Sequence, residues 1–230
     1  MTTSPTQLFP FAVPERLPAS AALADVLQLH GRRGWLTPPL RPFQRGPGQA
    51  VLGAARTIRM ASGPGSHGLG PLRALLGENL AGQVLVIAGA DCVPGAVWGE
   101  ILTTAALARG AVGALVEGNV RDVPALERLA LRIWASAEAT SGPGTGVHVA
   151  EVGGAVEIGG VRVAEGDPVL LDDGGAIALS PDSAPTLLAD AADYHQAEER
   201  VLEALVSGLM LPRAYAPKAQ VVTRLRARGL

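Results

Sequence analysis

Near the N-terminus, apolar residues recur at the spacing of an α-helix. Further along the chain they form the continuous runs that are typical of strands. Residues 19–30 (ASAALADVLQLH) space their apolar side chains along one helical face, and Ser20 is placed to cap the start. The run VLGAARTIRM at 51–60 predicts a strand, and PLRALLGENL at 71–80 predicts a short helix. Residues 1–18, rich in proline and without periodicity, predict an N-terminal arm.

The middle of the chain has the pattern of a β-α-β unit. QVLVIAG (83–89) and VGALVEG (112–118) are apolar runs typical of parallel strands buried on both faces. Between them, VWGEILTTAALARG (97–110) has helical spacing, and Gly110 is placed to end that helix. The order and lengths predict two adjacent parallel strands joined by a helix.

The last third changes pattern twice. Residues 147–180 alternate apolar residues with polar residues or glycine, and the breaks at GG, EGD and DDGG predict hairpin turns. Helical spacing returns from about Ala184, and residues 209–230 predict a C-terminal tail or helix. A parallel β-α-β unit followed by antiparallel hairpins predicts an α/β domain with a mixed sheet.

Composition and charge narrow the class of function. Hydrophobic residues make up 48% of the chain, enough for a sizeable core, and the net charge of −2 lacks the basic footprint of a nucleic-acid-binding protein. The single cysteine, Cys92, excludes an internal disulfide framework and a Cys-rich zinc site, and it fits a reducing cytoplasm. The N-terminus does not resemble a signal peptide, and no apolar run is as long as a membrane span. We therefore expect a cytoplasmic protein that binds neither nucleic acid nor a membrane.

Candidate chemistry follows the two predicted parallel strands, because ligands of open parallel sheets bind outside the carboxyl ends of the strands. A helix starts near Gly99, Glu100 and Ile101 after the first strand, and Arg121-Asp122 follows the second. We expect both at one sheet edge. Asp122 could hold a hard divalent ion, and Arg121 offers a planar fork to a carboxylate or enolate. With the positive end of the helix beside them, these groups suit a small 2-oxo acid.

The same residues also fit a purely structural interpretation. An Arg-Asp pair after a strand is often a surface ion pair or a turn cap, and a glutamate in the first turn of a helix interacts favourably with the helix dipole. Spacing alone leaves the catalytic and structural interpretations open.

One segment, WGEILTTAALARGAVGALVEGNVRDV (98–123), resembles the central motif of the RraA-like family, which contains the metal-dependent 4-hydroxy-4-methyl-2-oxoglutarate aldolases. That motif is an acidic residue, twenty intervening residues and then Arg-Asp; here Glu100 is followed by residues 101–120 and then Arg121-Asp122. Three flanking segments also resemble the family: ALADVL (22–27), GAARTIRM (53–60) and EGDPVLLDDGGAIAL (165–179).

This resemblance covers about residues 20–208 and implies a swivelling β/β/α-type domain, which we place at residues 19–208. It implies trimers or hexamers with sites between subunits. It also implies cleavage of 4-hydroxy-4-methyl-2-oxoglutarate, or its carboxylated relative, to pyruvate with Mg²⁺ or Mn²⁺, often with decarboxylation of oxaloacetate. The expected partner is therefore a small 2-oxo acid.

Carried over by position, the resemblance makes Asp122 the metal ligand and Arg121 the residue that binds the oxo-acid end of the substrate. Backbone amides at the helix start, around Ile101 and Leu102 and next to Gly99, would receive the pyruvyl carboxylate.

Two further roles in that site fall to glutamates. A glutamate from the C-terminal helix of a neighbouring subunit would complete the metal shell, and here Glu198 or Glu199 could do so, with Glu198 preferred. The base that takes the hydroxyl proton would be Glu100 or a hydroxide held by the metal. The family's aldolases carry Asp where this chain has Glu100, and the loop at 63–72 lacks a Gly-Asp pair found in many members.

These departures leave three functions to compare. The first is the aldolase. The second is a non-enzymatic regulator that binds an RNA-processing enzyme, as other members of the family do. The third is an enzyme of the same fold that acts on a different oxo acid, which the longer side chain of Glu100 would favour.

Overall fold

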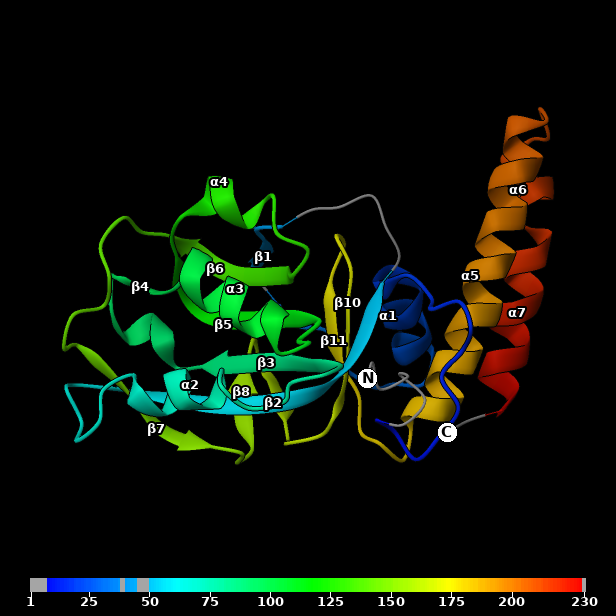
Figure 1. Cartoon of the computed structure of the whole chain (residues 1–230). Helices are drawn as coiled ribbons and strands as arrows, with labels where there is room; N and C mark the ends of the chain where they lie inside the picture. Colours follow the sequence, from blue (N-terminus) through cyan, green and yellow to red (C-terminus); the bar gives the residue numbers. More distant parts are fainter. Residues whose placement is uncertain (1–7, 38–39, 45–49, 229–230) are drawn as a thin grey trace.

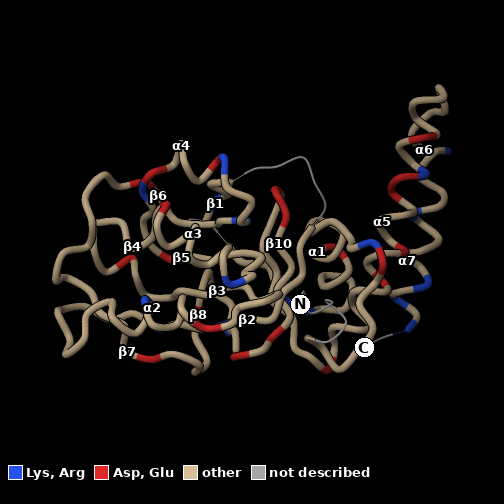
Figure 2. The backbone as a smooth tube through the Cα atoms, in the orientation of Figure 1, with Lys and Arg blue, Asp and Glu red and all other residues tan. Residues whose placement is uncertain are grey.

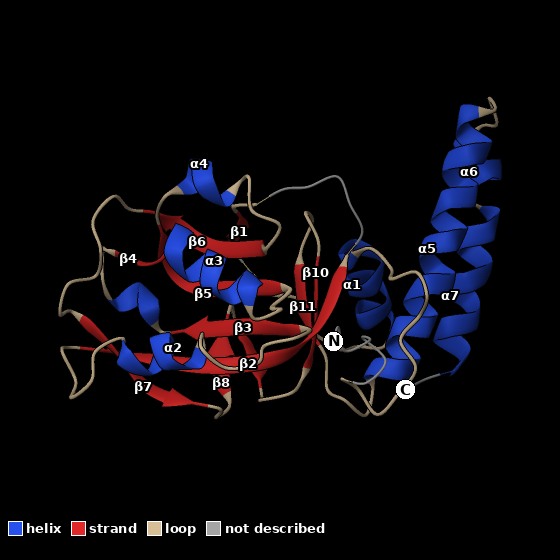
Figure 3. Cartoon of the chain, viewed as in Figure 1, coloured by secondary structure: helices blue, strands red, loops and turns tan. Residues whose placement is uncertain are grey.

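The computed structural model describes residues 8–37, 40–44 and 50–228. A mixed β-sheet with short helices forms the body, and a layer of longer helices stands at one end of it (Figures 1 and 3). Part of the predicted arm, residues 1–7, lies outside the described residues, as do residues 229–230 of the predicted C-terminal segment.

The described strands form one nine-stranded sheet and one two-stranded sheet. The strands of the large sheet are β1 (Arg41–Pro42), β2 (Val51–Ser62), β3 (Gln83–Ala88), β4 (Ala96–Trp98), β5 (Gly113–Val120), β6 (Arg132–Glu138), β7 (Val147–Val152), β10 (Pro168–Leu171) and β11 (Ala176–Ala178), and those of the small sheet are β8 (Val156–Ile158) and β9 (Val161–Val163). The main path of the large sheet runs β1-β6-β5-β3-β2-β10-β11, with β4 on β5 and β7 on β2.

Parallel pairing is confined to the centre of this sheet. β2, β3, β5 and β6 pair in parallel in that spatial order, and β4 also pairs in parallel with β5. β1, β7, β10 and β11 pair antiparallel around them. The mixed α/β fold is confirmed, as are the adjacent parallel strands and the antiparallel section after residue 147.

Strand β3 shows why the central run is continuously apolar. Val84 and Val86 pack on one face of the sheet, beneath β8 and β9, while Leu85 and Ile87 pack on the other face with the short helices. All four side chains are fully buried. Burial on both faces removes the alternation that a half-exposed strand would show.

The helices separate into two groups. On the body lie α2 (Gly70–Leu75), α3 (Glu100–Ala108) and α4 (Val123–Leu126); in the end layer lie α1 (Ser20–Leu29), α5 (Ala184–Val206), α6 (Leu211–Ala214) and α7 (Ala216–Arg228). α5 packs against both α1 and α7, and the α5–α7 pair projects beyond the sheet (Figure 1). Within the described ranges, no helix is both long enough and apolar enough to cross a membrane.

Two details of the predicted middle section were wrong. Residues 97 and 98, predicted as the start of the helix, belong to strand β4, because Ala96 and Trp98 pair with β5, and the helix begins at Glu100. Strand β6, beside β5, was not predicted. Its second half is partly exposed, so its apolar pattern is shorter than those of β3 and β5.

Ser20 is not the cap of α1 either, since the capping position is Ala19. The backbone N–H and hydroxyl of Ser20 instead donate to the two carboxylate oxygens of Asp172, at 2.7 and 2.6 Å. Asp172 lies in the predicted β10–β11 turn, where Oδ1 also accepts from the N–H groups of Gly174 and Gly175. One aspartate therefore shapes the hairpin and ties it to the start of the helix.

Candidate active site

A cavity of about 240 Å³ opens beside the start of α3, and we call it the main cavity. Its walls come from α2, β4, the first turn of α3, the loop after β5 and the loop before β7. The lining residues are Leu69, Leu72, Arg73, Ala96, Val97, Trp98, Gly99, Ile101, Leu102, Arg121, Asp122 and Pro143. The structure thus brings five of the predicted site residues to one cavity: Gly99, Ile101, Leu102, Arg121 and Asp122.

The pairing of β4 with β5 brings these residues together. Trp98 at the end of β4 lies opposite Val120 at the end of β5, and the N–H of Arg121 donates to the carbonyl of Trp98 at 3.0 Å. The start of α3 and the Arg-Asp dipeptide are therefore the continuations of two paired strands. The predicted convergence at one sheet edge is present, although β4 was not foreseen.

Gly99 allows the two continuations to approach closely. A Cβ atom at this position would lie 2.8 Å from Asp122 Oδ2 and 3.0 Å from Arg121 Cγ. Such contacts require a shift of the neighbouring side chains, so the glycine is needed for space. Its backbone is extended, a conformation open to any residue.

Asp122 has an unusual backbone conformation. It is the one described non-glycine residue with positive φ, at φ 60° and ψ 34°. The left-handed region is uncommon for side chains other than Asn, Asp and His, and such positions concentrate at functional sites. The turn directs the carboxylate toward α3, where Oδ2 accepts from the N–H of Glu100 at 3.3 Å.

The Arg121-Asp122 pair is loose. Arg121 Nε lies 3.8 Å from Asp122 Oδ2, and the two side chains are 46% and 43% exposed. Solvent-exposed pairs of this length contribute little to stability. Both residues also line a second hollow with Glu138 and Thr140, so they lie between two open spaces. Their charges remain available to a ligand.

The first turn of α3 is held firmly. Trp98 is buried, and its Nε1–H donates to the hydroxyl of Thr103 at 2.8 Å, which in turn donates to the carbonyl of Gly99. The amides of Ile101 and Leu102 lie in this turn, where an α-helix provides no acceptor of its own. They can therefore donate to an anion at the positive end of the helix.

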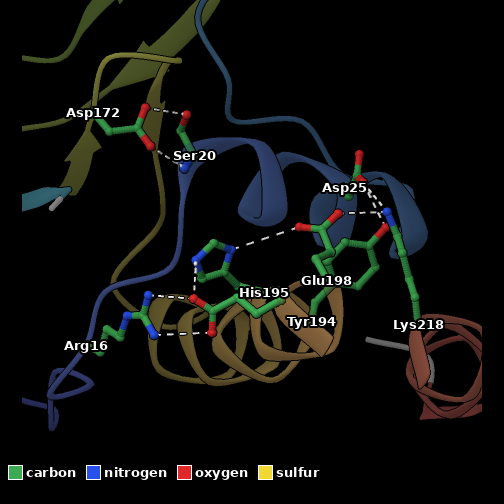
Figure 4. Close-up of polar contacts among 9 residues, drawn as sticks. Arg16, Ser20, Asp25, Asp172, Tyr194, His195, Glu198 and Lys218 are labelled. Carbon is green, nitrogen blue, oxygen red and sulfur yellow. Dashed lines mark hydrogen bonds and ion pairs between the residues drawn. The ribbon is translucent and has the colours of Figure 1, made fainter. Parts of the chain in front are cut away.

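Three predicted glutamates lie elsewhere. The side chain of Glu100 is exposed at the helix start and is not part of the wall of the main cavity. Glu198 accepts from Lys218 at 2.7 Å, and Glu199 forms an ion pair with Arg16 at 2.6 Å (Figure 4). Both glutamates lie on α5, in the end layer. Within one chain they do not join Asp122.

Arg73 also lines the main cavity, although it is not among the predicted site residues. A signal for it was present. β2 is parallel to β3, so the segment that follows β2 also leaves from the carboxyl edge of the sheet. Arg73 is the basic residue of the first helix after that edge.

The carboxylates available to a metal ion are few. Among the described residues, no three His, Cys, Asp or Glu side chains are grouped so that they could hold one, and Asp122 is the one described carboxylate that lines the main cavity. Mg²⁺ typically keeps several waters and binds through one or two carboxylates together with the substrate. The donor set fits a hydrated Mg²⁺ or Mn²⁺ and does not fit a zinc site of nitrogen and sulfur ligands.

A second polar group lies between the end-layer helices, and we call Lys218, Glu198, Asp25 and Tyr194 the α5–α7 cluster (Figure 4). Tyr194 donates to Asp25 at 2.7 Å, and burial together with this hydrogen bond raises the pKa of Tyr194 to about 12. Burial opposes the charge on Lys218, but hydrogen bonds to Glu198 and Tyr194 outweigh it and raise the pKa of the ammonium. These groups bind one another at the partly exposed contact between the end-layer helices.

Comparison with known proteins gives a family match. The model of the RraA-like family, described as Aldolase/RraA, matches residues 20–178. The match includes the main cavity and ends before α5.

Two curated proteins and one solved structure illustrate the similarity. Protein DlpA of Legionella pneumophila is 26% identical over 205 residues, which are 85% of this chain and 31% of DlpA, so the chain spans about a third of that relative. A Halalkalibacterium halodurans protein named "Putative 4-hydroxy-4-methyl-2-oxoglutarate aldolase" is 28% identical over 185 residues, covering 80% of this chain and 84% of that protein. Streptomyces coelicolor RraAS2, described as an unusual member of the RNase ES inhibitor RraA protein family, has a TM-score of 0.68 at 26% identity, covering 79% and 89% of the two chains.

Proposed function

The chain belongs to the RraA-like family, and on that basis we propose that it is a divalent-metal-dependent lyase that cleaves a 4-hydroxy-2-oxo acid such as 4-hydroxy-4-methyl-2-oxoglutarate to pyruvate. Oxaloacetate, which is also a 2-oxo acid, is the second substrate of the proposal. The observation that carries it is the placement of Arg121 and Asp122 against the first turn of α3 in one cavity. The similarity to the H. halodurans protein supports the same reaction class.

Binding of the oxo-acid end follows from the α3 terminus. The carboxylate of the substrate accepts from the amides of Ile101 and Leu102, and Gly99 leaves space for it beside the dipeptide. Arg121 donates to the 2-oxo oxygen, where negative charge develops. The apolar walls at Leu72 and Trp98 exclude water from the carbon skeleton.

The divalent ion, Mg²⁺ or Mn²⁺, would be held by Asp122. When bound, it supplies Lewis-acid polarisation of the 2-oxo group. Glu198 of a neighbouring subunit in a trimer or hexamer is the proposed second ligand, and it would have to leave Lys218 to act.

The reaction itself needs a base for the hydroxyl at C4. As that proton leaves, the C4 oxygen forms a carbonyl, the bond between C3 and C4 breaks, and the C4 fragment departs as a second carbonyl product, which for 4-hydroxy-4-methyl-2-oxoglutarate is also pyruvate. The electron pair of the broken bond stays on the other fragment as the enolate of pyruvate, which a proton at C3 converts to pyruvate. Arg121 shares the negative charge of the enolate. Glu100 is the base that this chain can supply at the helix start, and its exposed side chain would have to turn into the main cavity, whose wall it does not form, to act.

Pyruvate release tests the proposal directly. Purified protein is incubated with 4-hydroxy-4-methyl-2-oxoglutarate or oxaloacetate, and pyruvate is followed by coupled reduction to lactate. We expect turnover that a chelator abolishes and that added Mg²⁺ or Mn²⁺ restores. Absence of metal-dependent turnover at high protein concentration would contradict the proposal.

A second candidate is a regulator that binds an RNA-processing enzyme. The similarity to RraAS2, described as a member of an RNase ES inhibitor family, favours it. Pull-down with a ribonuclease of that class tests this function, and Asp122→Asn separates the two, because it should abolish turnover while leaving the fold of a binding surface intact.

A further inference from the structure

The wall of the main cavity contains a cation, Arg73, for which no partner is found among the described residues. Arg73 lines this cavity, and in the part of the chain that the structure describes its guanidinium has no hydrogen bond or ion pair. Arg56, Arg59 and Arg132 on the strands, by contrast, each bind a carboxylate of the protein. Arg73 is thus free to bind a carboxylate from solution.

The helix that carries Arg73 is anchored. Leu72 and Leu75 on α2 are almost fully buried in the core beneath it, and the N–H of Arg73 donates to the carbonyl of Leu69 at 3.2 Å. Leu69 and Leu72 line the main cavity with Arg73. The base of the side chain is therefore fixed, while the guanidinium end is exposed. Figure 2 shows a basic segment at α2, near β4.

The charges of the cavity wall do not balance. The described lining residues include two arginines, Arg73 and Arg121, and one carboxylate, Asp122, which already accepts from the Glu100 amide and faces Arg121. The remaining lining side chains are apolar. A cavity with an excess of positive charge and apolar walls suits a ligand with two anionic ends and a carbon skeleton between them.

The two arginines come from different walls. Arg121 follows β5 and lies beside the first turn of α3, where the oxo-acid end binds in the proposed function. Arg73 belongs to α2, which follows β2, and β3 separates β2 from β5 in the sheet. A single carboxylate group is not expected to contact both walls. If the oxo-acid end of the ligand lies at Arg121, Arg73 is therefore available to the opposite end.

We propose that Arg73 binds the distal carboxylate of the substrate and makes the site selective for 2-oxo dicarboxylates over 2-oxo monocarboxylates. This inference rests on the proposed function for the identity of the oxo-acid end. It adds a specificity-determining residue. A guanidinium-carboxylate hydrogen bond in a partly enclosed site corresponds to about 10- to 100-fold in affinity.

The test compares two substrates that differ in the distal carboxylate. Wild type and Arg73→Gln are assayed with 4-hydroxy-4-methyl-2-oxoglutarate and with 4-hydroxy-2-oxopentanoate, which lacks that group. Arg73→Gln should lower kcat/KM for the dicarboxylate about 10- to 100-fold and leave the monocarboxylate within about twofold. Arg73→Lys, which keeps the charge, should recover part of the loss.

Arg109 provides the matched control. It is exposed at the far end of α3 and does not line the main cavity, so Arg109→Gln makes the same change in net charge without touching the site. An equal loss on both substrates in Arg73→Gln, or no loss on either, would overturn the inference. A loss in Arg109→Gln as large as that in Arg73→Gln would also overturn it, because the effect would then be one of net charge.

A binding measurement separates this inference from the proposed function. Calorimetric titration with 2-oxoglutarate and with 2-oxobutanoate, both in the presence of Mg²⁺, requires no turnover. If wild type releases no pyruvate but Arg73→Gln weakens only 2-oxoglutarate binding, by about tenfold or more, the lyase proposal fails and the assignment of Arg73 stands. If wild type binds the two ligands equally, the assignment fails, whatever the turnover.

Discussion

The main cavity and the α5–α7 cluster use the same kinds of charged groups in opposite ways. Arg121 and Asp122 lie 3.8 Å apart with side chains nearly half exposed, whereas Lys218 and Glu198 lie 2.7 Å apart with side chains 15% and 30% exposed. The two charges of the first pair interact only weakly with each other, so both remain available to a ligand. Within one chain, the second pair links helices α5 and α7.

This difference shows how a functional site can be recognised: it matters more whether the charged groups lack protein partners than how many charged groups there are. Acidic and basic segments are frequent along α5 and α7 (Figure 2). The charged side chains drawn in Figure 4, however, point toward one another. The main cavity has fewer charged groups, and Arg73 there has no protein partner in the described structure. A functional site is indicated by charges that the fold leaves open, and a structural cluster by charges that it satisfies.

The largest effect should come from Asp122→Asn. Asparagine tolerates the left-handed backbone, so the fold should persist while the anionic ligand for the metal is lost. We expect kcat/KM for pyruvate release to fall about 100- to 1000-fold with little change in Tm. A variant that keeps wild-type turnover would remove Asp122 from the mechanism.

The second-largest effect should come from Gly99→Ala, which changes the space between the start of α3 and the Arg121-Asp122 dipeptide. Gly99→Ala places a methyl group against Asp122 and Arg121, so these side chains must move away from the helix start. We expect a loss of about 10- to 100-fold in kcat, because small misplacements in a site are costly. Gly70→Ala is the matched control, since a Cβ there meets only ordinary contact with His67. Equal turnover in both variants would show that the close approach at Gly99 is unimportant.

On the other side of the comparison, Lys218→Met should affect stability. The substitution leaves Glu198 without its cation and removes the ammonium above the Tyr194 ring. Because Glu198 remains partly solvated, the expected loss is about 1–2 kcal/mol in the free energy of unfolding, measured with urea. The kcat per folded molecule should not fall, since Lys218 lies outside the main cavity and its removal releases Glu198, the proposed ligand from a neighbouring subunit, from its ion pair. A large loss of turnover at unchanged stability would reverse the roles assigned to the two regions.

The smallest effect is a dependence of stability on alkaline pH. The pKa values of Lys218 and Tyr194 are raised in the folded protein, so their protonated forms are favoured there. Their contribution is complete below the unfolded values near pH 10 and declines as pH rises above them, toward the folded pKa of about 12 for Tyr194 and toward the raised folded pKa of Lys218. Urea unfolding across this range should show the stability difference between wild type and Lys218→Met shrinking with rising pH. A constant difference would mean that Lys218 does not titrate with folding.

The sequence predicted the centre of the molecule better than its periphery. Runs buried on both faces identified β3 and β5, and their parallel order was enough to bring Glu100, Arg121 and Asp122 to one edge. β4 is three residues long, and two of its residues fall in the predicted helix, because so short a strand leaves no periodic pattern in the sequence.

The sequence pattern could not predict contacts between segments that are distant along the chain. The partner of Ser20 lies 152 residues away in a hairpin turn, and the ion pair of Glu198 depends on the packing of α7 against α5. Arg73 was missed for a related reason. Its significance comes from its place in a particular cavity without a partner among the residues that the structure describes, and periodicity gives no information about partners.

A crystal soaked with Mn²⁺ and pyruvate tests most directly whether the charges at the main cavity are held open for ligands. We predict an anomalous peak for Mn²⁺ next to the Asp122 carboxylate, with the carboxylate of pyruvate on the amides of Ile101 and Leu102 and its oxo group facing Arg121. Mn²⁺ and pyruvate bound elsewhere, with Asp122 and Arg121 directed to solvent, would contradict the assignment of this cavity as the active site.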